Sequence, residues 1–274
     1  MFMSLVRKVV RRFLPLANSG PLVGPTFFSS YEEALSRCAN SKGYQEEALV
    51  EVVVEKNRLY REKVAADPVF DLEDYREIIG VAASGHSRPL RVIDFGGGAG
   101  AHFTVVNVAL SPTLELRWNV VETPHMARVS RSLEREGLKF FDNLEAARDD
   151  LGDVDLVFAS SSLQYTSDPL EALRSIISLE PKYIFITRTP FSNLPQQVSS
   201  IQPSLLSANG PGPLPDGWGD RVVSYPVTFV PKKVVEEILL EQYVIRFRTR
   251  EGKVSLGSSI EKVDYVGFFC ERRS

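Results

Sequence analysis

The chain has 274 residues, of which 43% are hydrophobic and 24% charged, values close to the averages of folded globular proteins, so neither a disordered chain nor a membrane bundle is indicated. With 32 lysines and arginines against 35 acidic residues, the net charge of −3 provides no general attraction to nucleic acid, and we expect no such partner. The two cysteines, Cys38 and Cys270, and the three histidines are scattered, which predicts a cytoplasmic location, no disulfide framework and no metal site.

The chain begins with a basic amphipathic pattern. Over residues 4–14, apolar side chains recur at helical spacing on one face, and Arg7, Lys8, Arg11 and Arg12 fall on the other. A secretory signal would instead contain an uninterrupted apolar stretch. Two interpretations are open: weak peripheral contact with the inner face of an anionic membrane, or packing within the protein or against another subunit.

Residues 1–85 are predicted to form a helical N-terminal section. The pattern is helical from Tyr31 to about Ile79, with interruptions at Gly43 and Pro68. Ser30, followed three positions later by an acidic residue, predicts a capping box at the start of this region. We expect the section to pack over one side of a sheet.

From residue 86 to the C-terminus, short β-rich runs alternate with helical stretches, which is typical of a parallel sheet with crossover helices. Only residues 251–261 separate the last two runs, too few for a crossover helix, so these two should form an antiparallel hairpin at one edge. The prediction is therefore an α/β fold with a Rossmann-like, seven-stranded, mostly parallel sheet. The predicted strands are Leu90–Phe95, Leu116–Val121, Leu138–Phe141, Val154–Ser160, Tyr183–Thr187, Tyr243–Thr249 and Tyr265–Cys270.

Proline, glycine and serine are frequent between Pro190 and Pro231. A loop this long inside a compact domain is usually functional or disordered. Because it would follow the carboxyl end of a central strand, we expect a substrate loop over about residues 190–231. Phe191 and Trp218 in this loop would close over the substrate.

The strongest chemical signal is the segment Arg91–Gly100, in which an apolar strand ends at Asp94 and is followed by alternate glycines. Glycine allows the chain to turn sharply and a ligand to approach the backbone. The pattern is ambiguous, because Gly96, Gly98 and Ala101 also fit the dinucleotide form G-x-G-x-x-A. An NAD(P)-dependent oxidoreductase and a non-catalytic Rossmann-like binding module therefore stay open as alternatives.

Two carboxylates favour S-adenosylmethionine as the cofactor. Asp94 lies where it can reach the cationic amino-acid end of that molecule, directly or through water, whereas it would repel a pyrophosphate. Glu122 ends the next strand and can accept hydrogen bonds from both ribose hydroxyls, a role it would also have in NAD proteins. The seven-strand count with a terminal hairpin also departs from the six-stranded dinucleotide fold.

Three motifs in order, Val92–Gly100, Val120–Glu122 and Asp153–Pro169, resemble those of class I S-adenosylmethionine-dependent methyltransferases, and the resemblance covers Leu90–Ile186. It implies methyl transfer from S-adenosylmethionine to a small or saccharide-like acceptor.

A narrower resemblance rests on the triple glycine, Thr187–Phe191 and Tyr225–Pro226, which are similar to a family of bacterial methyltransferases associated with surface-polysaccharide biosynthesis. This chain departs from that family's pattern at Thr187, where an acidic residue is common. No carboxylate role is therefore carried over to that position.

Carried over by residue, the resemblance places the glycine turn around the methionine part of the cofactor, Glu122 on the ribose, and the end of the fourth strand along the methionine chain. Asp142 and Asn143 would lie near the adenine, although capping of the helix that follows them is an equal alternative. The implied cofactor-binding residues are Asp94, Gly96, Gly97, Gly98, Glu122, Asp142, Asn143, Ser160 and Ser161.

Three residues are candidates to remove or orient the acceptor proton: Tyr165, His102 and Arg188. Methyl transfer is an in-line displacement, so positioning supplies much of the catalysis and a base is optional. His102 is alternatively a first-turn helix residue near the glycine turn. Arg188 can bind a phosphate or carboxylate with its planar fork, or form a structural ion pair with a local acid.

Overall fold

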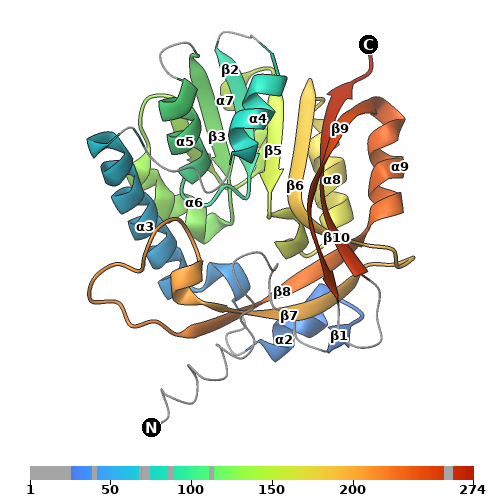
Figure 1. The fold of residues 1–274 in the computed structure, drawn as a ribbon, viewed down its shortest axis with the longest axis horizontal. Helices are drawn as coiled ribbons and strands as arrows, with labels where there is room; N and C mark the ends of the chain where they lie inside the picture. The colour runs from blue at the N-terminus through green and yellow to red at the C-terminus, as the bar shows by residue number, and fades with distance from the viewer. Residues whose placement is uncertain are drawn as a thin grey trace.

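The computed structural model describes residues 26–38, 42–67, 69, 75–85, 89–110, 114–255 and 262–274. In these parts of the chain, helices cover both faces of a central sheet (Figure 1). The basic helix predicted over residues 4–14 lies outside the described residues. None of the described helices is both long enough and apolar enough to span a bilayer.

Seven strands form the main sheet, in the order β4-β3-β2-β5-β6-β10-β9. They are β2 (Leu90–Phe95), β3 (Leu116–Val121), β4 (Leu138–Phe141), β5 (Leu156–Ser160), β6 (Tyr183–Ser192), β9 (Tyr243–Ser255) and β10 (Lys262–Arg272). The first five are mutually parallel, and β10 runs antiparallel to both β6 and β9. The predicted Rossmann-like sheet with an antiparallel terminal hairpin is therefore confirmed. The order reverses between β2 and β5, and ligands of open α/β sheets bind outside the carboxyl ends at such a point.

Three further strands correct the predicted count of seven: β1 (Phe27–Phe28), β7 (Val198–Leu205) and β8 (Val222–Pro231). β7 pairs antiparallel with both β1 and β8, and the end of β8 joins the end of β6 in parallel. The single long loop expected over residues 190–231 is thus wrong, because most of this segment is a β-hairpin. Prolines on both strands, Pro203 and Pro226, concealed it, since proline lacks the N–H that a ladder needs.

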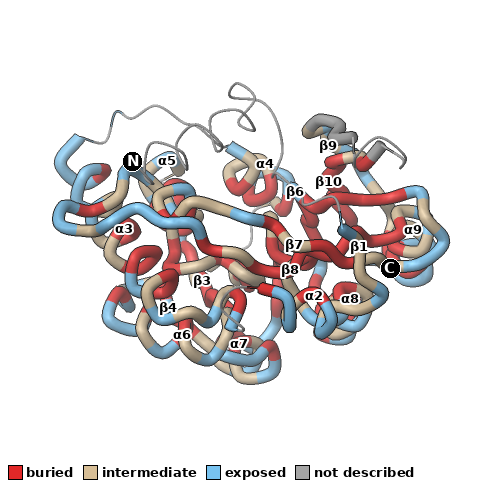
Figure 2. The backbone as a smooth tube through the Cα atoms, turned by 90° about the horizontal axis from the view of Figure 1, so that it is seen from below, coloured by how far each residue is buried: buried red, intermediate tan, exposed pale blue. Residues whose placement is uncertain are grey.

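The β7–β8 hairpin forms a floor under the main sheet. Figure 1 shows the two strands crossing beneath the carboxyl ends of the parallel strands, and Figure 2 shows the same hairpin from below. Seven consecutive residues of β8, 225–231, are buried, so the hairpin is part of the core. The helix α2 (Tyr31–Arg37) packs against β7 and β8.

Two layers of helices complete the fold. One face of the sheet packs against α3 (Glu47–Ala66), α4 (Arg76–Ala83), α5 (Ala101–Leu110) and α6 (Pro124–Ser130), and the other against α7 (Leu144–Leu151), α8 (Pro169–Ser178) and α9 (Lys232–Gln242). Side chains of β5 alternate between the layers: Leu156 and Phe158 face the first, and Val157 and Ala159 the second. Of the described helices before β2, α3 and α4 pack over one side of the sheet, as expected, whereas α2 packs against the β7–β8 hairpin.

The start of α2 confirms one half of the predicted capping box. The Ser30 hydroxyl accepts a hydrogen bond from the backbone N–H of Glu33 at 3.1 Å. The Glu33 carboxylate, however, accepts from Ser29 rather than from the cap residue itself. The Ser30 hydroxyl thus satisfies an N–H of the first helical turn, and Glu33 holds the residue that precedes the cap.

Candidate active site

The glycine turn joins β2 to α5 at the carboxyl end of the strand. Gly96 and Gly98 have φ values of 70° and 60°, in the left-handed region where other residues are strained. A Cβ on Gly96 would lie 2.3 Å from the Cβ of Ser162, and one on Gly97 would lie 2.2 Å from Oδ2 of Asp94. The turn therefore packs directly against the segment after β5 and against a buried carboxylate.

That carboxylate, Asp94, is fully buried beneath the turn. Its Oδ2 accepts a hydrogen bond from Nε1 of Trp118 at 3.1 Å and lies 2.9 Å from Nδ1 of His102. Its Oδ1 has no hydrogen-bond partner among the described residues. A buried carboxylate oxygen without a donor is costly, so Oδ1 is ready to accept from a donor that enters the turn.

Glu122, at the end of β3, binds the same turn from the side. Its Oε1 accepts from the backbone N–H of Gly98 at 3.0 Å, and its Oε2 accepts from the N–H of Thr123 at 2.9 Å. Burial raises the pKa of Glu122; the two backbone donors oppose this rise, and the charge of Asp94 adds to it. The two predicted cofactor carboxylates are thus close enough for like-charge repulsion.

The other predicted cofactor residues lie at the end of β5 and at the start of α7. Ser160 ends β5 with its hydroxyl buried, and Ser161 follows in a left-handed conformation with a φ of 54°. Asn143 caps α7, because its side chain accepts from the N–H of Ala146 at 2.8 Å, and it also donates to Asp142. The capping alternative for Asn143 is therefore confirmed, and adenine contact stays a prediction for both residues.

His102 lies in the first turn of α5, with Nδ1 against Asp94 and its ring edge-on to Phe158. Burial lowers the pKa of His102, but the charge and hydrogen bond of Asp94 outweigh it, and Glu77 adds to the rise while Arg188 opposes it. The pKa of His102 is therefore raised overall. A carboxylate that orients one imidazole nitrogen leaves the other nitrogen to handle a proton, so both sequence interpretations of His102 fit its position.

Tyr165 reaches the floor formed by β7 and β8. Its hydroxyl donates to Oε1 of Gln202 at 3.0 Å, and its ring packs with Tyr44 and Tyr225 at centroid distances of 4.8 and 5.3 Å. Burial raises the pKa of Tyr165 to about 12. At neutral pH the phenol stays protonated, so it can orient a group by hydrogen bonding but cannot serve as a general base.

The sequence predicts that Arg188 follows the end of its strand, and the structure shows that it does not. β6 continues to Ser192, and Arg188 lies within it at a bulge, with a φ of 55° and an exposed side chain. The guanidinium lowers the pKa of both His102 and Tyr265, so its charge lies near both side chains. The charge of Glu77 raises the pKa of the same imidazole, so an acidic side chain also lies near His102. Both interpretations of Arg188, anion binding and a structural ion pair with a local acid, therefore stay open.

Sequence reasoning missed Glu251 of β9, a side chain only 4% exposed. Its carboxylate accepts hydrogen bonds from the Thr187 hydroxyl and from the backbone N–H of Arg188. A carboxylate therefore does lie beside Thr187, but a distant strand provides it. The sequence signal, a glutamate before a glycine in a β-rich run, is compatible with a bulge but does not identify the partner.

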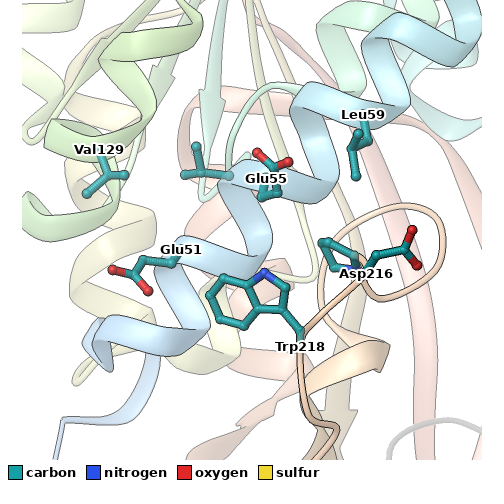
Figure 3. A pocket seen from close by; sticks show the side chains of 8 residues that line it. Glu51, Glu55, Leu59, Val129, Asp216 and Trp218 are labelled. Atoms are coloured by element: carbon teal, nitrogen blue, oxygen red, sulfur yellow. The ribbon is translucent and has the colours of Figure 1, made fainter.

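The structure also corrects the predicted closing residues. Phe191 is buried in the core against Phe268 at a centroid distance of 5.2 Å, so it cannot move over an acceptor as part of a loop. Trp218, in contrast, lies on the connection between β7 and β8 and faces α3 across a groove of about 540 Å³ (Figure 3). The groove is lined by Glu51, Val54, Glu55, Leu59, Val129, Pro215, Asp216 and Trp218, and thus by none of the predicted cofactor or catalytic residues.

In the part of the chain that the structure describes, no three His, Cys, Asp or Glu side chains cluster in a way that could hold a metal ion. Donors and acceptors at the candidate site are instead the glycine turn, two carboxylates, an imidazole and a phenol. These groups can hold a polar organic ligand that carries hydroxyl groups and positive charge.

Several solved structures are similar to this chain. A 1,6-didemethyltoxoflavin-N1-methyltransferase from Burkholderia thailandensis, with 1,6-didemethyltoxoflavin and S-adenosylhomocysteine bound, is 15% identical, with a TM-score of 0.46 over 93% of this chain and 94% of that one. An S-adenosylmethionine-dependent methyltransferase from Clostridium acetobutylicum is 13% identical, with a TM-score of 0.44 over 80% of this chain and 98% of that one. The N-terminal domain of EvdMO1, solved in the presence of S-adenosylhomocysteine and D-fucose, is 14% identical, with a TM-score of 0.39 over 81% and 84%.

All three TM-scores are below 0.5, so the fold assignment rests on the strand order itself. No protein-family model matches the sequence. No curated protein matches it either.

Proposed function

We propose that this chain is an S-adenosylmethionine-dependent methyltransferase that acts on a small or saccharide-like acceptor. The observation that carries the proposal is the pair of carboxylates at the glycine turn: Glu122 accepts from Gly98 N–H at 3.0 Å, and Asp94 lies beneath with one oxygen unpartnered among the described residues. Two nearby carboxylates attract a cation and repel a pyrophosphate. The arrangement favours a sulfonium cofactor over NAD(P), and a ligand-binding turn over an inert one.

S-adenosylmethionine would supply a methyl group on positively charged sulfur. Glu122 would accept hydrogen bonds from the ribose hydroxyls, exchanging part of its present bonding to the turn. Asp94 is 0% exposed, so its spare oxygen would act on the amino-acid end through a water or after a small shift of the turn. Ser160 and Ser161 would line the methionine chain.

The acceptor loses one proton when it gains the methyl group, and two side chains can assist. His102, oriented through Nδ1 by Asp94, would take the proton at Nε2 while it is neutral. Tyr165, whose pKa is about 12, would stay protonated and orient the acceptor by accepting a hydrogen bond from it, because its own O–H donates to Gln202. With the acceptor held in line with the sulfonium, positioning would supply most of the rate enhancement.

The identity of the acceptor and the cellular location are supported by sequence features alone. The resemblance to methyltransferases of surface-polysaccharide biosynthesis supports a saccharide-like acceptor, and the basic pattern over residues 4–14 supports weak contact with the inner face of an anionic membrane. Co-sedimentation with anionic vesicles tests the second point, and a chain lacking residues 1–15 should then bind less. Equal binding by both chains would contradict it.

The cofactor assignment is tested by thermal unfolding with S-adenosylhomocysteine, NAD and NADP. At a ligand concentration about a hundredfold above the dissociation constant, S-adenosylhomocysteine should stabilise the fold by roughly 2.7 kcal/mol. The dinucleotides should have no effect. Stabilisation by NAD or NADP alone would overturn the proposal, and no stabilisation by any of the three would favour a non-catalytic module.

A further inference from the structure

Two β-bulges lie close together on opposite sides of β10, one at Gly267 facing β6 and one between Tyr265 and Val266 facing β9. On β6, Thr187 and Arg188 together oppose the single residue Gly267 of β10. On the other side of β10, Glu251 of β9 is the extra residue that the register passes over. Bulges change the direction of side chains and are frequent next to active sites. Here the two bulges lie near enough for Glu251 to reach the backbone of Arg188 across β10.

The Glu251 side chain crosses β10 at Gly267. Its Oε2 accepts from the backbone N–H of Arg188 at 2.6 Å, and its Oε1 accepts from the hydroxyl of Thr187. A Cβ on Gly267 would lie 2.2 Å from Oγ1 of Thr249 and 3.3 Å from Oε1 of Glu251. Glycine at this position therefore leaves room for the side chains of Thr249 and Glu251 over β10.

The charge of Glu251 is balanced locally. Its Oε1 lies 2.9 Å from Nε of Arg76 in α4 and also accepts from Oγ1 of Thr249 at 2.9 Å. A carboxylate that is only 4% exposed requires such a counterion. The two oxygens thus differ in role, since Oε1 holds neighbouring side chains and Oε2 holds the Arg188 backbone.

Arg188 needs this support because its φ of 55° is unfavourable for a residue with a side chain. Its peptide groups are held on both sides, by Glu251 at the N–H and by Nε2 of Gln164 at the carbonyl oxygen, at 3.2 Å. In this conformation the guanidinium charge acts on His102 and Tyr265. The backbone conformation therefore determines where the charge of Arg188 lies.

We propose that Glu251 is a positioning residue, which holds Arg188 in its left-handed conformation and so directs the guanidinium towards His102, where the acceptor would bind. The inference rests on the proposed function in taking the surroundings of His102 as the acceptor site. The bulge and its hydrogen bonds do not depend on the cofactor.

The test variant is Glu251→Gln. The amide keeps one acceptor for Arg76 and the threonines and places an NH₂ group opposite the N–H of Arg188. The pKa of His102, followed by NMR titration and identified by loss of its signal in His102→Gln, reports the position of the guanidinium, because Arg188 lowers that pKa. We expect the pKa of His102 to rise in Glu251→Gln, towards its value in Arg188→Ala.

The direction of this shift separates positioning from direct charge effects. Asp94 and Glu77 raise the pKa of His102, and Arg188 lowers it. Loss of a carboxylate elsewhere nearby would lower the pKa, so a rise requires the guanidinium to move away. An unchanged or lowered pKa would overturn the proposal. The matched control is Glu271→Gln, which removes a carboxylate paired with Arg246 on the same hairpin and should leave His102 unaffected.

A double-mutant cycle gives a second, independent measurement. Glycine adopts a left-handed φ without strain, so Glu251→Gln should destabilise the Arg188→Gly protein less than the wild type. Strict additivity would show that Glu251 only holds α4 and β9 in place. If Glu251→Gln does not fold, Glu251→Asp keeps the charge but shortens the side chain, which should release the N–H of Arg188 and raise the pKa of His102 in the same way; no rise there would also overturn the proposal.

Cofactor binding separates this inference from the proposed function. S-adenosylhomocysteine affinity should be nearly unchanged in Glu251→Gln. The hydrogen bonds and the ion pair of Glu251 described above join it to Thr187, Arg188, Thr249 and Arg76, and none of these residues belongs to the glycine turn. If the wild type fails to bind S-adenosylhomocysteine, the proposed function fails while the titration and the cycle still decide the role of Glu251.

Discussion

Two buried carboxylates, one from β2 and one from β9, flank the candidate site and differ in their partners. Asp94 accepts from Trp118 and His102 and has one oxygen with no partner in the described parts of the chain. Glu251 uses both oxygens and is paired with the guanidinium of Arg76. A carboxylate with a spare oxygen suits ligand binding, whereas one with a matched charge suits maintenance of shape. The β2 side is thus organised to receive a ligand, and the β6–β10–β9 side to hold a strained backbone.

The largest expected effect is that of Gly96→Ala, a substitution in the glycine turn on the ligand-binding side. The new Cβ would lie 2.3 Å from the Cβ of Ser162, at a φ of 70°. Overpacking and left-handed strain together should cost about 2–5 kcal/mol of folding stability, and cofactor binding should be lost. Urea unfolding and titration with S-adenosylhomocysteine measure both effects. Gly219→Ala is the control, because nothing lies within 4 Å of its new Cβ; equal stability of the two variants would contradict the packing argument.

Glu122→Gln should have the next largest effect, and on affinity rather than on the fold. An amide provides one acceptor where the carboxylate provides two, and a hydrogen bond to a charged group contributes about 1.5–3 kcal/mol, so S-adenosylhomocysteine should bind roughly 10- to 100-fold more weakly. Calorimetry of the wild type and the variant measures this. Unchanged affinity would show that Glu122 holds only the turn.

Arg188 tests the other side of the comparison with a smaller effect. Arg188→Ala should leave S-adenosylhomocysteine affinity nearly intact, because the lost contact is to the acceptor. Arg188→Gly loses the same side chain but relieves the left-handed strain, so it should be more stable than Arg188→Ala by about 1 kcal/mol. If both variants lose cofactor affinity and stability together, Arg188 is instead a structural ion-pair residue.

The same division explains what could be predicted from the sequence. The glycine turn and Glu122 can be identified from the sequence because they follow consecutive strands. Gly98 and Glu122 are only 24 positions apart. Glu251 is 64 positions from Thr187 and 175 from Arg76, so no local pattern connects them. A residue's role on this side depends on register across three strands, which a sequence does not specify by itself.

The β7–β8 hairpin was missed for another reason. Its prolines and serines resemble a loop, and its strands are recognisable only through pairing with each other and with the end of β6. The floor beneath the site, with the Tyr165–Gln202 hydrogen bond, was therefore beyond sequence reasoning. Tyr165 itself was found because it follows β5, and only its surroundings were unknown.

The smallest expected effect concerns the pH dependence of stability on the ligand side. The pKa of His102 is raised, since Asp94 outweighs the effect of burial. A group whose pKa is raised on folding contributes stability that is fully present below its unfolded pKa and is lost as pH rises through the folded pKa. The charged pair should therefore stabilise the protein at about pH 5.5 and no longer at about pH 9. His102→Gln keeps a donor for Asp94 but does not titrate, so subtracting its stability from that of the wild type isolates the imidazole. We expect the difference in unfolding free energy, measured in urea at both pH values, to favour the wild type at low pH and to shrink at high pH. A constant difference would show that folding leaves the pKa of His102 unchanged. A difference that favours the wild type more at high pH would show that the imidazole stays neutral in the folded protein, bonded to Asp94 only as a hydrogen-bond donor. With a neutral imidazole, no neighbouring cation on His102 would offset the charge of Asp94, which would strengthen its attraction for a cationic cofactor.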